Sequence, residues 1–194
     1  PSAASRSRAT DAATARYDRR DCGVRGVDRA PAARRRVTAV IAVVILAALD
    51  LGLKAWAERR LTTDHTIELP AIGLRLAHNP GIAFGFGHTL PTVVLLAGIG
   101  TIIAGMTVLT WRATAPECSL AWPPLAAMLA GAIANFADRA GDGVVTDYLH
   151  TGWWPTFNLA DTYITCGAIA LAALTLRPAR TGTNSHSETK YDAR

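Results

Sequence analysis

Two aspartates, Asp147 and Asp161, are the residues of this chain whose type and position most favour a chemical role. They are fourteen residues apart, and each lies in a polar stretch beside an apolar run. Ionisable groups at a membrane boundary are costly to keep there, so a functional site is their default interpretation. Two carboxylates that meet share a proton and can activate water. The pair therefore indicates an aspartic hydrolase.

Asp50 and Lys54 form a second polar pair. They are four residues apart with the acid first, which is the favoured order for an ion pair on a helix. Two interpretations stay open: a structural pair that anchors the end of a helix, and a part of the chemical site.

Another group of polar residues has helical spacing. Gly131, Asn135 and Asp138 are at i, i+4 and i+7, on one helix face, and Arg139 follows directly. The small Gly131 permits close approach of a second helix. Asp138 and Arg139 are either an interfacial pair that reaches towards water or a scaffold that orients other groups through charge-assisted hydrogen bonds.

Two shorter signals complete the polar set. Asn158 and Asp161 are at i and i+3, so they share a helix face. Asn79 is followed by Pro80 and Gly81, which is a turn signal just before an apolar run. Composition alone favours a simple helix entry at this turn.

Four apolar segments must position these residues. Each is close to the roughly 20 residues that a helix needs to cross a hydrocarbon core of about 30 Å. All five tryptophans lie at or just beyond the ends of these segments, as in the aromatic belts of membrane proteins. The predicted spans are residues 37–56, 90–111, 120–137 and 157–176.

Arginines set the expected orientation. A cluster at 34–36 precedes the first span, and Arg177 and Arg180 follow the fourth. Positive flanks favour the cytoplasmic side, so both termini and the connection 112–119 are expected inside. The connections 58–89 and 138–156 are then outside. On this topology the polar residues collect at the outer face: Asp50, Lys54, Asn135, Asp138, Arg139, Asp147, Asn158 and Asp161.

The first outer connection carries a strand signal. Residues 66–69 and 74–78 alternate apolar and polar side chains, which is the period of a half-buried strand. We therefore expect an all-α membrane protein with four transmembrane helices and a small extramembrane β-lobe between spans one and two.

The ends of the chain differ from its middle. Of the 194 residues, 1–36 contain ten Arg and four Asp with few large apolar side chains, and 178–194 are polar again. Both segments are predicted to be disordered, because they cannot bury enough apolar surface to offset ordering. They flank one membrane domain at 37–177. The basic arm lacks the interleaved aromatics of a nucleic-acid site, so contact with anionic membrane lipid is the expected role.

The three cysteines predict neither a disulfide framework nor a metal site. Cys22, Cys118 and Cys166 are scattered, and the chain has no CxxC and no His cluster at ligand spacing. Cys22 follows a charged run, so the chain is not expected to be a lipoprotein itself. A cleaved signal peptide is not expected either, because the first apolar run begins near Val37 and no small-residue cleavage site follows it.

Taken in order, the short motifs resemble the motif series of lipoprotein signal peptidase (signal peptidase II). Any one of them is weak, but five occur in order on four predicted spans, over about residues 37–177. They are Asp50-xxx-Lys54, Asn79-x-Gly81-x-Ala83-Phe84, Gly131-xxx-Asn135-xx-Asp138-Arg139, Gly143-xVx-Asp147 and Phe157-Asn158-x-Ala160-Asp161.

The resemblance implies a bacterial inner-membrane aspartic endopeptidase. Such an enzyme cleaves prolipoproteins on the N-terminal side of a diacylglyceryl-modified cysteine, needs no cofactor or metal, and is blocked by cyclic peptide antibiotics such as globomycin. The family's β-cradle would map onto 58–89, and we expect a monomer. The family's catalytic dyad falls on Asp147 and Asp161. Supporting roles fall on Asp50, Lys54, Asn79, Gly81, Asn135, Asp138, Arg139 and Asn158.

Some positions depart from the family pattern. Pro80 follows Asn79 where a small polar residue is common, and Ile82 stands where Ala is usual. Tyr148 replaces the usual Phe, and the connection between the two aspartates is short. These departures affect loop shape and substrate preference, and they leave both aspartates in place.

Three other classes of protein compete with this interpretation. A proton-coupled transporter would more often place its carboxylates near the midplane within inverted repeats, and this chain shows no repeat. A presenilin-like protease would carry Gly-x-Gly-Asp, which is not the order of Gly141-Asp-Gly143. A non-catalytic membrane scaffold stays open, because a sequence does not prove activity.

Overall fold

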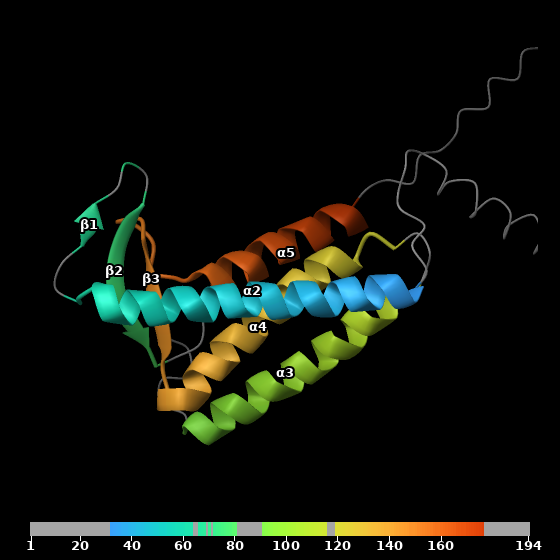
Figure 1. Cartoon of the computed structure of the whole chain (residues 1–194), viewed down its shortest axis with the longest axis horizontal. Helices are drawn as coiled ribbons and strands as arrows, with labels where there is room; N and C mark the ends of the chain where they lie inside the picture. Colours follow the sequence, from blue (N-terminus) through green and yellow to red (C-terminus); the bar gives the residue numbers. More distant parts are fainter. Residues whose placement is uncertain are drawn as a thin grey trace, which may run out of the picture.

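Helices dominate the molecule, and one small sheet lies at their end (Figure 1). The structure is a computed structural model that describes residues 32–63, 66–68, 70, 72–80, 91–115 and 119–176. The predicted disordered arms, apart from residues 32–36, lie outside the described residues, as do Gly81 and Ile82. The helices are α2 (Ala32–Arg60), α3 (Thr92–Ala113), α4 (Trp122–Asp142) and α5 (Leu159–Thr175).

Each helix occupies one of the four predicted apolar segments, with shifted ends. α2 begins five residues before the predicted start and continues to Arg60, and α4 continues past Ala137 to Asp142. The α4 extension ends at Gly143, whose φ of 90° is the left-handed conformation that glycine adopts without strain. These extensions matter because they carry Glu58 and Asp138 towards the sheet.

α4 is the central helix of the bundle. It contacts α2, α3 and α5, whereas α2 and α5 touch each other little. Its buried face is built from small residues, among them Ala130, Gly131 and Ala134. Gly131 allows the closest approach, since a methyl group there would collide with the Ala160 carbonyl of α5. The small-residue face therefore brings the start of α5 against α4.

Apolar side chains cover the outside of the bundle. Val37, Val44 and Ile45 on α2 and Val93, Ile102 and Val108 on α3 are all more than half exposed. Exposed apolar side chains in this number fit lipid rather than water. By length and composition, α2 and α3 are the two candidate membrane spans of the described part of the chain. The 17-residue α5 is a shorter apolar helix, and the predicted count of four spans is not established by this criterion.

The sheet has three antiparallel strands in the order β1-β2-β3. β1 (Ile67–Glu68) and β2 (Gly73–Asn79) lie in the connection between α2 and α3, where the sequence predicted strands. β3 (Val145–His150) was not predicted, and it comes from the segment after α4. It pairs Ala77 with Asp147, with a register irregularity between Leu74 and Ala77. The lobe is thus completed by the strand that carries one of the two key aspartates.

Candidate functional site

Asp147 and Asp161 reach the site from a strand and from a helix. Asp147 lies in the middle of β3 and is 3% exposed. Asp161 is the third residue of α5, in its first turn. The chain leaves α4 at Gly143 and continues into β3, which lies beside the start of α5. Figure 1 shows this junction, where the sheet meets the ends of α2, α4 and α5.

Asn158 connects the two aspartates. It is the N-cap of α5, and its Oδ1 accepts the Asp161 N–H at 2.9 Å while Asp161 Oδ2 accepts the Asn158 N–H at 3.2 Å. This reciprocal capping box satisfies N–H groups that a helix start leaves unpaired. The Asn158 Nδ2 donates to Asp147 Oδ1 at 2.7 Å. One fully buried side chain therefore fixes Asp147 against the helix turn that carries Asp161.

Asn135 of α4 extends this network. Its Nδ2 donates to Asp161 Oδ1 at 2.9 Å. Its Oδ1 accepts from Lys54 Nζ at 2.6 Å and from Asn158 Nδ2 at 3.2 Å. Because the lysine occupies the amide oxygen, the amide NH₂ is directed at the aspartate.

Lys54 forms ion pairs with two other aspartates. Its Nζ is 3.2 Å from Asp50 Oδ2 and 3.1 Å from Asp138 Oδ2. Asp50 Oδ1 accepts the Ala160 N–H at 2.9 Å. Buried charges persist only when they are paired and hydrogen-bonded, and Asp50 and Lys54 are both buried. The pair orients Asn135 and the start of α5 through these contacts.

Asp138 and Arg139 are not an interfacial pair that reaches to water. Arg139 is 3% exposed, and its Nη2 donates to the Asn79 carbonyl at 3.0 Å. Asp138 Oδ2 accepts the Thr146 N–H at 2.8 Å, in addition to the Lys54 contact. The Asn79 side chain hydrogen-bonds to Asp147. Arg139 thus joins α4 to the end of β2, so the scaffold interpretation describes these residues.

The electrostatic setting favours a protonated Asp147 near neutral pH. Burial away from water, followed by the negative charge of Asp161, raises the pKa of Asp147 to about 7. Hydrogen bonds from the side chains of Asn158 and Asn79 oppose this rise. A carboxyl that holds its proton to pH 7 beside a second carboxyl is suited to general acid and base work.

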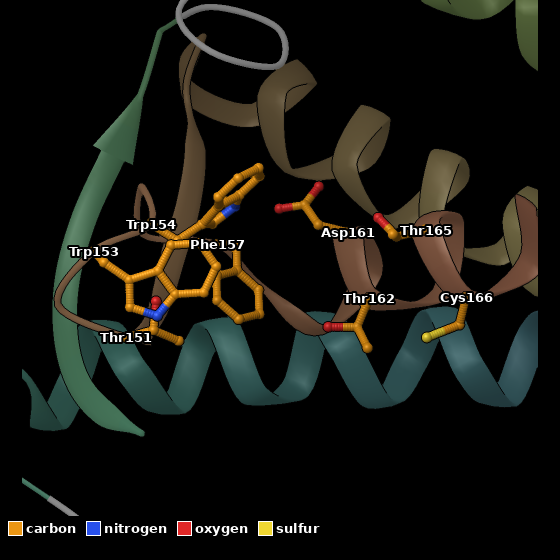
Figure 2. A pocket seen from close by; sticks show the side chains of 8 residues that line it. All are labelled: Thr151, Trp153, Trp154, Phe157, Asp161, Thr162, Thr165 and Cys166. Atoms are coloured by element: carbon orange, nitrogen blue, oxygen red, sulfur yellow. The ribbon is translucent and has the colours of Figure 1, made fainter. Parts of the chain in front are cut away.

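A pocket of about 370 Å³ opens beside Asp161. Figure 2 shows the Asp161 side chain at the pocket, with three aromatic residues on one side and α5 residues along the other. Trp153 and Trp154 are in edge-to-face contact, with ring centroids 5.6 Å apart. Ligand sites are commonly apolar clefts with few polar groups, and this pocket has that character. Its lining is Thr151, Trp153, Trp154, Phe157, Asp161, Thr162, Thr165 and Cys166.

Sequence reasoning missed three residues that hold the site. Glu58 lies four residues after Lys54 on α2, and Thr146 and Tyr148 flank Asp147 in β3. The helical spacing of Asp50, Lys54 and Glu58 was a signal for the first. The strand β3 was not recognised, so nothing marked Thr146, and Tyr148 was noted only as a departure from the family's usual Phe. Over the residues described, no group of three His, Cys, Asp or Glu side chains is arranged to hold a metal ion.

Comparison with known proteins gives consistent matches. The family model described as signal peptidase (SPase) II matches residues 41–177. Proteins named lipoprotein signal peptidase are similar to this chain. The one from Rhodococcus jostii is 36% identical over 151 residues, which is 74% of each chain. The one from Brucella ovis is 40% identical over 141 residues, covering 70% of this chain and 88% of its own.

A solved structure shares the fold. It is described as a bacterial membrane enzyme determined by the in meso method at 2.3 Å resolution. It superposes with a TM-score of 0.66 over 79% of this chain and 94% of its own, at 23% sequence identity.

Proposed function

This chain belongs to the signal peptidase II family, and from that premise we propose that it is a membrane aspartic endopeptidase whose catalytic dyad is Asp147 and Asp161. The family is one of proteases that remove signal peptides from prolipoproteins. The proposed cleavage is at the peptide bond before a diacylglyceryl-modified cysteine. The observation that carries the proposal is that the buried Asn158 holds the Asp147 carboxylate and the Asp161 turn together.

The four buried or partly buried aspartates of the site divide into two kinds. Lys54 pairs with Asp50 and Asp138, which also accept backbone N–H groups of other elements. Asp147 and Asp161 instead receive side-chain amides, from Asn158 and Asn135. An amide NH₂ can donate to a carboxylate and also to the carbonyl oxygen of a protonated carboxyl, so amide donors tolerate either protonation state. The second kind is therefore the one suited to proton transfer.

The proposed reaction follows from this division. The dyad holds one proton, and its ionised member takes a proton from a water molecule that attacks the scissile carbonyl carbon. The protonated member donates to the carbonyl oxygen, and a proton is then delivered to the leaving amine. The two carboxyls titrate as a coupled unit, so the proton belongs to the pair. Asn135 and Asn158 hold the carboxylates in place while their charges exchange.

The substrate is proposed to approach through the pocket beside Asp161. Its rim of Trp153, Trp154 and Phe157 is aromatic, and its far wall continues along α5. Aromatic residues favour the membrane interface, and such a rim accepts a lipid-bearing segment at that depth. We place the site at the outer face of a bacterial cytoplasmic membrane, with four spans and both termini inside. The chain is proposed to act as a monomer, without a cofactor, and to be inhibited by globomycin.

The test is cleavage of a diacylglyceryl-modified prolipoprotein by purified protein reconstituted in lipid. Asp147→Asn and Asp161→Asn are each expected to lower the rate by at least about 10³-fold, because an amide neither accepts nor releases the proton. Asp142→Asn is the matched control. Asp142 is exposed at the end of α4, and its Oδ1 accepts the Val144 N–H, which an asparagine oxygen can also do.

Full cleavage by either dyad variant would refute the assignment. Cleavage by wild-type protein that globomycin does not inhibit would place the activity outside this mechanism. If the protein cleaved an unlipidated precursor as fast as the lipidated one, the proposed specificity for diacylglyceryl-modified substrates would be wrong.

A further inference from the structure

Asp147 lies between two residues whose hydroxyl groups are bonded to other elements. Thr146 and Tyr148 flank it in β3, and both side chains are buried. Successive side chains of a strand point to opposite faces, so these two share the face opposite Asp147. Neither residue is among the supporting set that the family motifs indicate. Their hydroxyl groups therefore contact other elements, α2 and the start of α5, from the face of β3 opposite Asp147.

Thr146 is joined to three separate segments. Its Oγ1 donates to Glu58 Oε1 of α2 at 2.9 Å. Its backbone N–H donates to Asp138 Oδ2 of α4 at 2.8 Å, and its carbonyl accepts from Asn158 Nδ2 at 3.4 Å. The residue directly before Asp147 is thus held by α2, α4 and the start of α5 together. Only the α2 contact depends on the threonine side chain.

Glu58 is the residue of α2 that makes this contact. It lies one turn beyond Lys54, which is itself one turn beyond Asp50, so the three residues share one helix face. Lys54 and Asp50 support Asn135 and α5. Glu58 extends the same face of α2 to β3, the strand that carries Asp147.

Tyr148 makes the corresponding contact on the other side of Asp147. Its hydroxyl accepts the N–H of Leu159, the first residue of α5, at 3.2 Å. The first N–H groups of a helix have no partner within the helix, so this oxygen satisfies one of them. The side chain belongs to a buried cluster with Ala57 and Leu61. A phenylalanine would fill the same space without the oxygen.

We propose that Glu58 and the hydroxyls of Thr146 and Tyr148 are positioning groups that fix Asp147 relative to Asp161. Glu58 and Thr146 hold β3 to α2, and Tyr148 holds β3 to the helix start that carries Asp161. None of the three lines the pocket beside Asp161, so they act through the aspartate. This inference rests on the proposed function, because it assigns Asp147 to the dyad.

The first experiment removes the Glu58–Thr146 contact. Thr146→Val and Glu58→Ala are each expected to lower kcat about 10- to 100-fold with little change in KM, since small misplacements of reacting groups have effects of this order. The double variant is expected to be no worse than either single variant, because both remove one interaction. Thr146→Ser keeps the hydroxyl and Glu58→Gln keeps an acceptor oxygen, so each should restore most of kcat.

The second experiment removes one oxygen atom. Tyr148→Phe is expected to lower kcat in the same direction, with the alkaline limb of the pH profile displaced because the relation of Asp147 to Asp161 changes. If Thr146→Val does not accumulate as folded protein, the kcat of Tyr148→Phe still tests whether the β3 hydroxyls position Asp147.

Two control variants separate positioning from general stability. Arg59→Ala changes an exposed neighbour of Glu58 and should leave kcat unchanged. Leu61→Ala disturbs the buried cluster around Tyr148 without removing a hydroxyl. It should lower Tm while kcat and the pH profile, measured well below Tm, stay near wild type.

The outcomes distinguish this inference from the proposed function. Wild-type protein that fails to cleave the lipidated precursor counts against the proposed function itself. Active wild-type protein with full kcat in Thr146→Val and Tyr148→Phe overturns only the positioning role. A loss of kcat in Leu61→Ala equal to that in Tyr148→Phe, or no recovery in Thr146→Ser, overturns it as well.

Discussion

At the scale of single residues, the aspartates of the site differ in the groups that bind their carboxylates. Asp50 and Asp138 share the Lys54 ammonium, while Asn135 and Asn158 donate to Asp161 and Asp147. Burial and the negative charge of Asp161 raise the pKa of Asp147 to about 7, while its side-chain hydrogen bonds come from neutral amides. The proposed division of roles among these aspartates therefore rests on their neighbours, and the residue type alone does not reveal it.

The pH dependence of cleavage tests this environment. The protonated form of Asp147 is depleted as pH rises through its pKa of about 7. If the reaction needs that proton, kcat/KM should fall above about pH 7, approaching tenfold per pH unit. The Asn158 hydrogen bond lowers the pKa of Asp147. In Asn158→Ala the alkaline limb should therefore move to higher pH, on a lower overall rate.

The measurement is the initial rate of lipopeptide cleavage between pH 5 and 9 at constant ionic strength. Asp142→Asn should keep the wild-type profile, because Asp142 lies outside the network. A wild-type rate that is constant from pH 6 to 9 would contradict the prediction.

At the scale of elements, close packing of α4 on α5 sets where α5, the helix that carries Asp161, begins. A methyl group at Gly131 would meet the Ala160 carbonyl, and it would lie 3.0 Å from Ile164 Cγ1. Ala160 is next to Asp161, and its N–H is held by Asp50. Separating α4 from α5 would therefore pull the first turn of α5 away from Asn135.

Gly131→Ala is expected to destabilise the protein by roughly 1–3 kcal/mol, as overpacked substitutions do, and to lower the cleavage rate. Gly105→Ala in α3 is the matched control. An added methyl group there meets nothing within 4 Å, and alanine is the better helix former. Tm and cleavage rate of both variants check the prediction, which fails if Gly131→Ala matches Gly105→Ala in both.

At the scale of the whole molecule, the helices expose apolar side chains along their length, and the buried aspartate network lies at one end. The sheet, the ends of α2 and α4 and the start of α5 lie together at that end (Figure 1). At the opposite end, the Arg36 guanidinium lies 4.5 Å from the Trp111 ring centroid, a cation–π contact between α2 and α3. Arginine at one end and the aspartate network at the other agree with the proposed orientation.

Labelling of single cysteines tests this orientation. After replacement of Cys22, Cys118 and Cys166, Trp153→Cys should react with a membrane-impermeant maleimide in intact cells, since Trp153 is 81% exposed beside the pocket. Ala115→Cys, just after α3, should react only after the membrane is permeabilised.

The reverse pattern would invert the topology. Reaction of both positions from outside would mean that α4 does not cross the membrane, which would refute the four-span proposal.

The amino-acid sequence alone determined the local features of this protein. Apolar runs of membrane length predicted the four helices of the described residues, alternation in 66–69 and 74–78 predicted β1 and β2, and helical spacing placed Asn135 with Asp138 and Asn158 with Asp161. These features depend on neighbours within a few residues, so periodicity carries them.

Only the tertiary structure decided which of these residues meet. β3 is a short edge strand, and its burial comes from α2 and β2, which lie far away in the sequence. Residues 145–150 therefore lack the alternation of apolar and polar side chains that marks a half-buried strand, because both faces of β3 are covered at residues 145–148. The contacts of Lys54 with Asp138 and of Glu58 with Thr146 span more than 80 residues. Such pairings depend on how whole helices pack, and no local pattern records them.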